Sequence, residues 1–125
     1  MEFVLTFHQP AEVFEVNDDP VRGVAPMQAW KLYMEAMAAA GVLRGANRLE
    51  QFSQTAVRVR NGKREVQDGP FADTREKLAG AFVIEVPDLD AAISWAAKCP
   101  GAQYGWVEVR PAELVFSEGS WHQAK

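Results

Sequence analysis

The chain has 125 residues, of which 48% are hydrophobic and 24% are charged, values typical of one soluble globular domain with one hydrophobic core. A formal net charge of −4 argues against a nucleic-acid or anionic-membrane partner, and no stretch reaches the roughly 18 consecutive apolar residues of a membrane span. The single cysteine, Cys99, excludes an internal disulfide, so a reducing cytoplasm is the expected location.

Residues 2–8 alternate in polarity and predict a strand. Its core face carries Phe3, Leu5 and Phe7. Its other face carries Val4, Thr6 and His8. Because this second face is also partly apolar, we expect something to cover it. A strand so near the first residue makes a cleaved secretory signal unexpected.

Residues 9–25 predict a loop that contains turn-forming residues such as Asn17-Asp18-Asp19-Pro20. A loop of this length is uncommon in a compact domain, and it is either a surface excursion or a lid over a pocket. Residues 26–40 then predict a helix, with Pro26 in its first turn and Gly41 just past its end.

This predicted helix carries large apolar side chains at the helical period: Met27, Trp30, Met34 and Met37. The pattern favours packing of the helix against a sheet. Stacking of Trp30 or Tyr33 on a cofactor is the alternative. Residues 42–49 predict the next strand, in which Gly45 indicates a bulge and Asn47 faces a cavity near the strand end.

Two short runs, residues 55–60 and 63–67, flank Asn61-Gly62 and predict a β-hairpin. Asn and Gly both tolerate the positive φ that a type I′ turn needs. The hairpin also contains a basic cluster of Arg58, Arg60, Lys63 and Arg64. Because Glu65 and Asp68 follow it, a solvated hairpin face is favoured over a phosphate site.

The stretch 68–78 joins this hairpin to the most apolar segment of the chain. Asp68-Gly69-Pro70 predicts a sharp turn, and Asp73 predicts the cap of a helical turn over residues 74–77. Residues 79–86 then predict a central strand.

The central strand is apolar on both faces. One face carries Phe82, Ile84 and Val86, and the other carries Ala81 and Val83. Two helices cover one face of a sheet, so a second subunit is the simplest cover for the other. At about 25 cal/mol per Å², several such side chains left in water would cost several kcal/mol.

Asp88 predicts the cap of a helix over residues 89–99, and residues 104–110 predict the last strand. The domain is therefore expected to span residues 1–116. Residues 117–125 predict a polar tail, in which Trp121 is the residue that suggests docking.

Four segments resemble one known family. Residues 68–76 (DGPFADTRE) resemble the signature of the DGPF-domain proteins, a branch of the YCII-related family. Residues 55–58, 80–100 and 107–111 match in the same order and spacing. The resemblance implies a small ferredoxin-like α+β domain that pairs into a dimeric α+β barrel, and most DGPF members have no assigned activity.

The expected fold is therefore α+β. Its βαββαβ order is ferredoxin-like, with an inserted hairpin and an antiparallel sheet that has two helices on one face. Some YCII-related proteins carry a proposed His-Asp dyad. The His of that dyad lies early in the first helix and the Asp after the second, where this chain has Gln28 and Cys99-Pro100. The resemblance therefore implies that the dyad is absent, which gives no support for transferring the dehalogenating lyase activity of one relative to this chain.

His8 is the best candidate for proton transfer, because an imidazole titrates near neutral pH. Asp68 and Asp73 are its candidate partners, and structural roles in a turn and a cap are the alternative reading of both. Candidate ligand contacts are Trp30, Asn47, Phe71, Arg75 and Arg110. Arginines bind carboxylates in a bidentate way, although salt bridges to nearby acids are favoured here. No metal site and no cofactor are expected.

Three functions follow from these residues and the resemblance. The first is a homodimer that binds a small organic molecule in a cleft between sheet and helices. The second is a lyase or isomerase that uses His8 with Asp68 or Asp73. The third, which rests on the association of some relatives with sigma-factor-like proteins, is a regulatory interaction module.

Overall fold

A four-stranded antiparallel sheet forms the body of the protein. The computed structural model describes residues 1–51, 54–70 and 75–124. The strands lie in the order β2-β5-β1-β6. They are β1 (Glu2–Pro10), β2 (Leu43–Arg48), β5 (Glu76–Glu85) and β6 (Trp106–Pro111). The register shifts between Leu43 and Gly45, which confirms the predicted irregularity at Gly45.

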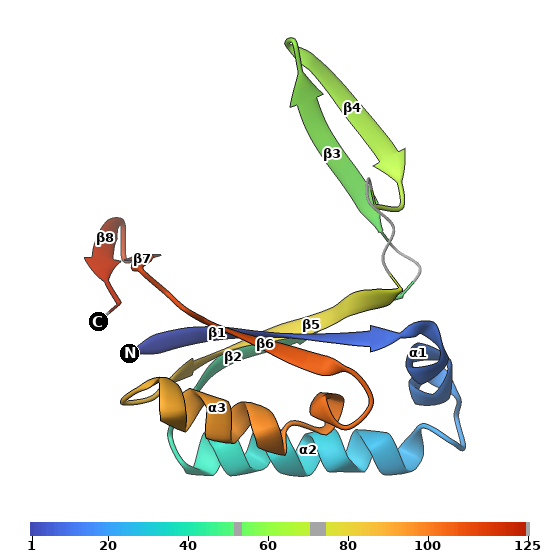
Figure 1. Cartoon of the computed structure of the whole chain (residues 1–125), viewed down its shortest axis with the longest axis vertical. Helices are drawn as coiled ribbons and strands as arrows, with labels where there is room; N and C mark the ends of the chain where they lie inside the picture. Colours follow the sequence, from blue (N-terminus) through green and yellow to red (C-terminus); the bar gives the residue numbers. More distant parts are fainter. Residues whose placement is uncertain (52–53, 71–74, 125) are drawn as a thin grey trace.

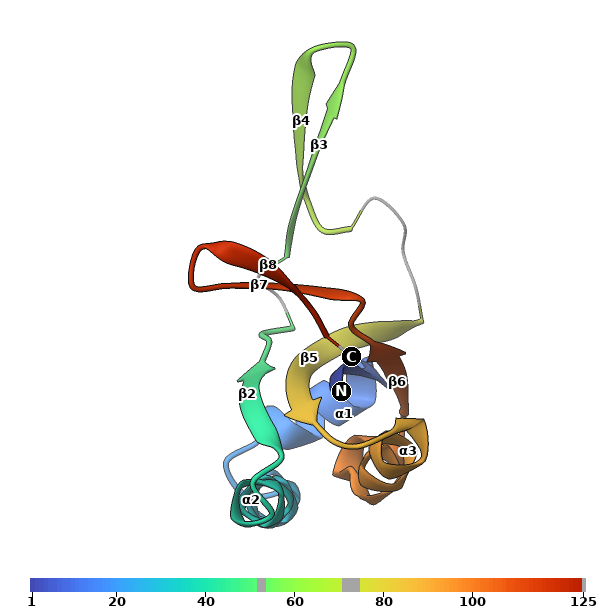
Figure 2. The ribbon, with the colours of Figure 1, turned by 90° about the vertical axis from the view of Figure 1, so that its left-hand side faces the viewer.

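Two helices, α2 (Val24–Ala39) and α3 (Leu89–Lys98), lie side by side against one face of the sheet (Figures 1 and 2). A 3₁₀ turn, η1 (Pro100–Ala102), follows α3. The sheet and these helices have the predicted βαββαβ order, so the α+β fold with a ferredoxin-like core is confirmed. Within the described ranges, no helix is long and apolar enough to cross a membrane.

The hydrophobic core fills the space between the sheet and the helices. Its largest fully buried side chains are Phe3, Leu5, Met37, Phe82, Ile84 and Cys99. Asp88 caps α3 as predicted, since its carboxylate accepts a hydrogen bond from the Ala91 backbone nitrogen at 2.8 Å. In β1 every second residue is buried, so the strand has one core face, as its alternating sequence predicted.

The predicted hairpin projects from the body into solvent (Figures 1 and 2). It consists of β3 (Thr55–Arg60) and β4 (Lys63–Asp68), and Asn61 and Gly62 have φ values of 52° and 73°, as a type I′ turn requires. Arg58 forms an ion pair with Glu65 across the strands. The basic cluster is thus on a solvated face.

The prediction of a loop over residues 9–25 was wrong for its first part. β1 continues to Pro10, and α1 (Ala11–Asp18) follows it at the end of the sheet (Figure 1). The helix forms because Phe14 reaches the core, where it is 3% exposed. The structure therefore has a third helix that the turn-rich composition concealed.

Two further predictions of local structure differ from the fold. Glu76 and Lys77 were expected in a helical turn but pair with the end of β1, because that strand offers free backbone partners there; Asp73 and Thr74 lie outside the described residues. The predicted polar tail contains most of a hairpin, β7 (Leu114–Ser117) and β8 (Ser120–Gln123), held by cross-strand pairing and the Phe116–Trp121 ring contact at 5.1 Å.

Candidate functional site

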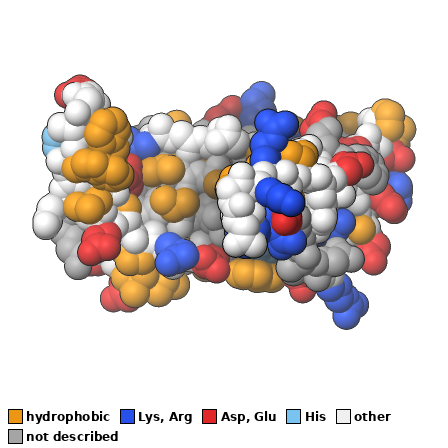
Figure 3. Space-filling view, turned by 90° about the horizontal axis from the view of Figure 1, so that it is seen from above, with side chains coloured by type: hydrophobic (Ala, Val, Ile, Leu, Met, Phe, Trp, Pro, Cys, Tyr) orange, Lys and Arg blue, Asp and Glu red, His pale blue; other side chains and the backbone are white. Residues whose placement is uncertain are grey.

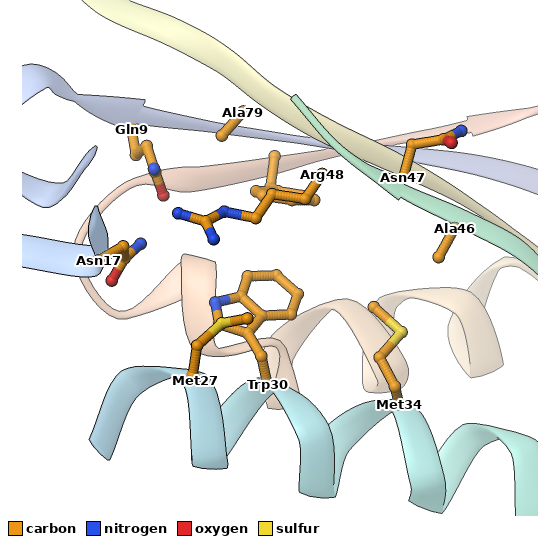
Figure 4. Close-up of a pocket in the computed structure, with 10 residues that line it drawn as sticks. Gln9, Asn17, Met27, Trp30, Met34, Ala46, Asn47, Arg48 and Ala79 are labelled. Carbon is orange, nitrogen blue, oxygen red and sulfur yellow. The ribbon is translucent and has the colours of Figure 1, made fainter. Parts of the chain in front are cut away.

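A pocket of about 190 Å³ lies between the sheet and α2 (Figure 4). Its apolar lining is Phe7, Met27, Trp30, Met34, Ala46 and Ala79. Its polar lining is Gln9, Asn17, Asn47 and Arg48. The lining comes from β1, α1, α2, β2 and β5, so the fold brings together residues that are far apart in the sequence.

Aromatic side chains form one wall of the pocket. The ring of Phe7 is 4.6 Å from the indole of Trp30, and that indole meets the ring of Tyr33 edge-on at 6.0 Å. The Trp30 Nε1 atom donates a hydrogen bond to the hydroxyl of Tyr104 at 3.2 Å. The polar group of the indole is therefore satisfied by the protein, and what remains for the pocket is apolar surface.

Gln9 supplies the most deeply buried polar group of the pocket. The residue is 3% exposed, and its Oε1 atom has no hydrogen-bond partner among the described residues. A buried carbonyl oxygen without a partner costs about 1–3 kcal/mol. In Figure 4 the side-chain amide points from β1 into the pocket.

Arg48 and Asp18 mark the exposed end of the pocket. The Arg48 Nη2 atom donates to the Asp18 Oδ1 atom at 2.8 Å, which links β2 to the last residue of α1. About half of each side chain is exposed, so this ion pair is worth less than about 1 kcal/mol. In Figure 4 the guanidinium lies between Gln9, Asn17 and the indole of Trp30.

His8 lies on the opposite face of the sheet from this pocket. Its ring stacks on the indole of Trp106 at 4.0 Å, and its Nε2 atom is 3.1 Å from the Thr6 hydroxyl. Over the residues that are described, neither Asp68 nor another carboxylate forms a hydrogen bond or ion pair with His8. Its proton-transfer role stays a prediction.

The other predicted site residues are scattered. Asp68 ends β4 opposite Thr55, and Arg75 is an exposed residue just before β5. Arg110 lies on the same face as His8, with its Nε atom 3.9 Å from the Glu108 carboxylate. Phe71 and Asp73 lie outside the described residues.

Of the predicted ligand contacts, Trp30 and Asn47 line the pocket, although the Asn47 side chain points away from it (Figure 4). Sequence reasoning missed Gln9, Asn17 and Arg48. Gln9 could have been identified as an inward-facing residue, because it continues the alternation of Phe3, Leu5 and Phe7 along the same face of the strand.

Cys99 packs in the core below η1 and is fully buried. Burial raises the pKa of its thiol to about 11, against the smaller lowering effect of backbone hydrogen bonds from Gly101 and Ala102. Burial likewise raises the pKa of Tyr33, whose hydroxyl donates to the Trp95 carbonyl at 2.8 Å. Both groups are therefore neutral at physiological pH.

A pH dependence of stability follows. Because the folded pKa of Cys99 is above its ordinary value of 9.0, the stability that it contributes is complete below about pH 9 and is lost as the pH rises toward 11. The expected loss is about 2–3 kcal/mol. Urea unfolding of wild type and Cys99→Ala across this range tests it: the variant should lose less stability, and parallel curves would contradict the buried thiol as a cause.

Three comparisons place the chain among known proteins. The family model of the YCII-related domain matches residues 2–114. Uncharacterized protein R00369 of Rhizobium meliloti (strain 1021) is 42% identical over 55 residues, which are 42% of this chain and 44% of that protein, so the match spans less than half of the relative.

Among solved structures, the chain is similar to 5-chloro-2-hydroxyhydroquinone dehydrochlorinase (TftG) from Burkholderia phenoliruptrix AC1100, in complex with 2,5-dihydroxybenzoquinone. The identity is 13% and the TM-score 0.48, over 86% of this chain and 91% of that chain. The family match, in contrast, extends over nearly the whole sequence. The protein therefore belongs to the family of YCII-related domains.

Proposed function

We propose that this protein binds a small organic molecule in the pocket between its sheet and α2. The observation that carries the proposal is the amide of Gln9, which is buried in the pocket wall with an unpartnered oxygen. Nearly all buried polar groups in folded proteins have a partner. A ligand that pairs with this amide would remove the cost of leaving it unpaired.

The size and the lining of the pocket support a small ligand. A volume of about 190 Å³ equals roughly six waters at about 30 Å³ each, which is enough for one substituted ring. Most of the lining is apolar, and Figure 4 shows the polar groups of Gln9, Asn17 and Arg48 gathered at one end. Binding sites for small molecules commonly combine an apolar wall with a few polar groups that set orientation.

A pocket-filling variant tests this proposal. A thermal-shift screen of wild type against a metabolite library should find ligands that raise the melting temperature, since a ligand at 100 times its Kd stabilises by about 2.7 kcal/mol. Ala46→Phe should abolish the shifts, because Ala46 points into the pocket opposite Met34 (Figure 4).

The matched control is Ala36→Phe, on an exposed part of α2. It should leave every shift unchanged. A broad library without a single shift, or shifts that persist in Ala46→Phe, would contradict binding in this pocket.

We also propose that the protein is a homodimer that pairs through the face of the sheet without helices. Val4, Ala81 and Val83 lie on this face and are half-buried, while Trp106 is 44% exposed. Both hairpins stand on this side of the sheet (Figures 1 and 2). A second copy would cover an apolar face that this chain leaves open.

The exposed side chains of the hairpins support the same assembly. Val57, Val59 and Val66 of the first hairpin are 55–60% exposed. Phe116 and Trp121 of the second are 57% and 66% exposed, and Figure 3 shows hydrophobic side chains gathered at this end of the molecule. Since an isolated two-stranded hairpin is only marginally stable in water, packing against another surface is expected.

Sedimentation tests the dimer. Wild type at about 100 µM, a concentration far above the Kd of a stable interface, should sediment at twice the chain mass of 13.9 kDa. Val83→Lys should sediment as one chain, because a lysine buried without a partner is strongly unfavourable. Leu32→Lys, on the outer side of α2 at 57% exposure, is the control and should stay dimeric. A monomeric wild type would refute the assembly.

A further inference from the structure

We infer that the ligand of this pocket is an aromatic hydroxy acid: a flat ring with a hydroxyl that pairs with Gln9 and a carboxylate that pairs with Arg48. The inference rests on the proposed binding function and adds its chemical class. Three observations carry it, one for each part of the ligand: the unpartnered amide of Gln9, the indole and thioether wall, and the guanidinium of Arg48.

The buried side chain of Gln9 favours a ligand group that donates a hydrogen bond. The Gln9 Oε1 atom is an acceptor, and it has no protein donor in the parts of the chain that are described. A carboxylate cannot satisfy it, because two acceptors repel each other. A hydroxyl can donate a hydrogen bond to Oε1 and so satisfy this acceptor.

The aromatic wall of the pocket favours a flat apolar ring on the ligand. The ring of Phe7 and the indole of Trp30 lie 4.6 Å apart at an angle of 39° and form a continuous aromatic surface. In Figure 4 the side chains of Met27 and Met34 rise from α2 beside this surface. Aromatic rings and thioether sulfurs both pack favourably against a further aromatic ring.

The guanidinium of Arg48 favours an anionic group on the ligand. Within the described ranges, the polar contact of the Arg48 guanidinium is the one between Nη2 and Asp18. In Figure 4 the guanidinium lies between Gln9, Asn17 and the indole of Trp30, and a planar guanidinium binds a carboxylate through two parallel hydrogen bonds. Because about half of the ion pair is solvent-exposed, a ligand carboxylate can share or replace Asp18 at small cost.

Calorimetry with matched probes tests the class. The probes are 2-hydroxybenzoate and 3-hydroxybenzoate, with benzoate lacking the hydroxyl and phenol lacking the carboxylate. For wild type we expect one hydroxybenzoate to bind about fivefold more tightly than benzoate, and about tenfold more tightly than phenol. Equal affinity for phenol and for both hydroxybenzoates would overturn the inference.

Two variants assign the preferences to residues. Gln9→Met keeps the length of the side chain and removes its hydrogen bonds, so it should bring the hydroxybenzoate-to-benzoate ratio close to one. Arg48→Met should bring the hydroxybenzoate-to-phenol ratio close to one, and Arg48→Lys should restore part of it. Ratios that the variants leave at their wild-type values would overturn the assignment. Should Gln9→Met not fold, the wild-type ratios decide the class.

Failure of this inference differs from failure of the proposed function. If other metabolites shift the melting temperature of wild type but not of Ala46→Phe, while no hydroxybenzoate binds, the pocket is a binding site and the ligand class is wrong. If nothing in the library or the probe set binds, both are wrong.

Discussion

Replacing Phe82 with alanine is expected to lower the free energy of unfolding by about 3–5 kcal/mol. The side chain is 1% exposed at the centre of β5, and its ring lies 5.9 Å from Tyr33 and 6.3 Å from Phe7. Truncation removes buried apolar surface and leaves a cavity that the flanking rings cannot fill without leaving their own positions.

The matched control for this prediction is Leu32→Ala. Leu32 lies on α2 and is 57% exposed, so its truncation should change stability by less than about 0.5 kcal/mol. Urea unfolding followed by circular dichroism measures both changes. A loss below about 1 kcal/mol for Phe82→Ala would show that the sheet and helices do not pack around this ring, because well-packed phenylalanines do not yield such values.

The second large effect is expected for Gly80→Ala, which should destabilise the protein by about 2–3 kcal/mol or more. A Cβ atom at Gly80 would lie 2.3 Å from the Asn47 carbonyl oxygen and 2.4 Å from a ring carbon of Phe7. The carbonyl belongs to the β2–β5 pairing and cannot move without loss of ladder hydrogen bonds. Phe7 can yield only by shifting against Trp30 in the pocket wall.

A second strand glycine serves as the control. A Cβ atom at Gly45 of β2 would meet nothing within 4 Å. Gly45→Ala should therefore be neutral or stabilise by up to about 1 kcal/mol, because alanine restricts the unfolded chain. Thermal unfolding of the two variants decides the matter: equal melting temperatures would contradict the close approach of β2 and Phe7 to Gly80.

Local patterns predicted most elements because those elements depend on near neighbours in the sequence. Asn61-Gly62 predicted its turn, since both residues tolerate positive φ. Asp88 predicted the start of α3, since a cap needs only the next three residues. α1 was missed because its stability comes from Phe14 reaching a core that no local pattern describes.

Local sequence patterns also failed to predict most of the residues that line the pocket. Trp30 was predicted either to pack or to stack on a ligand, and it does line the pocket with part of its indole. Gln9 was placed in a loop, although it follows the alternation of β1 and is buried. Arg48 gave no signal, because its significance arises from Asp18, 30 residues away in the sequence.

The amino-acid sequence by itself determined the βαββαβ order of the core, the inserted hairpin and the family, because periodicity, turn residues and motif spacing are properties of short segments. It also determined that both faces of the central strand are apolar. Only the tertiary structure decided how α2 packs against the core face of the sheet and which residues of β1, α1 and β2 meet there. That packing put Gln9, Trp30 and Arg48 around one pocket and His8 on the open face, since residues distant in the sequence meet only when the sheet and helices pack.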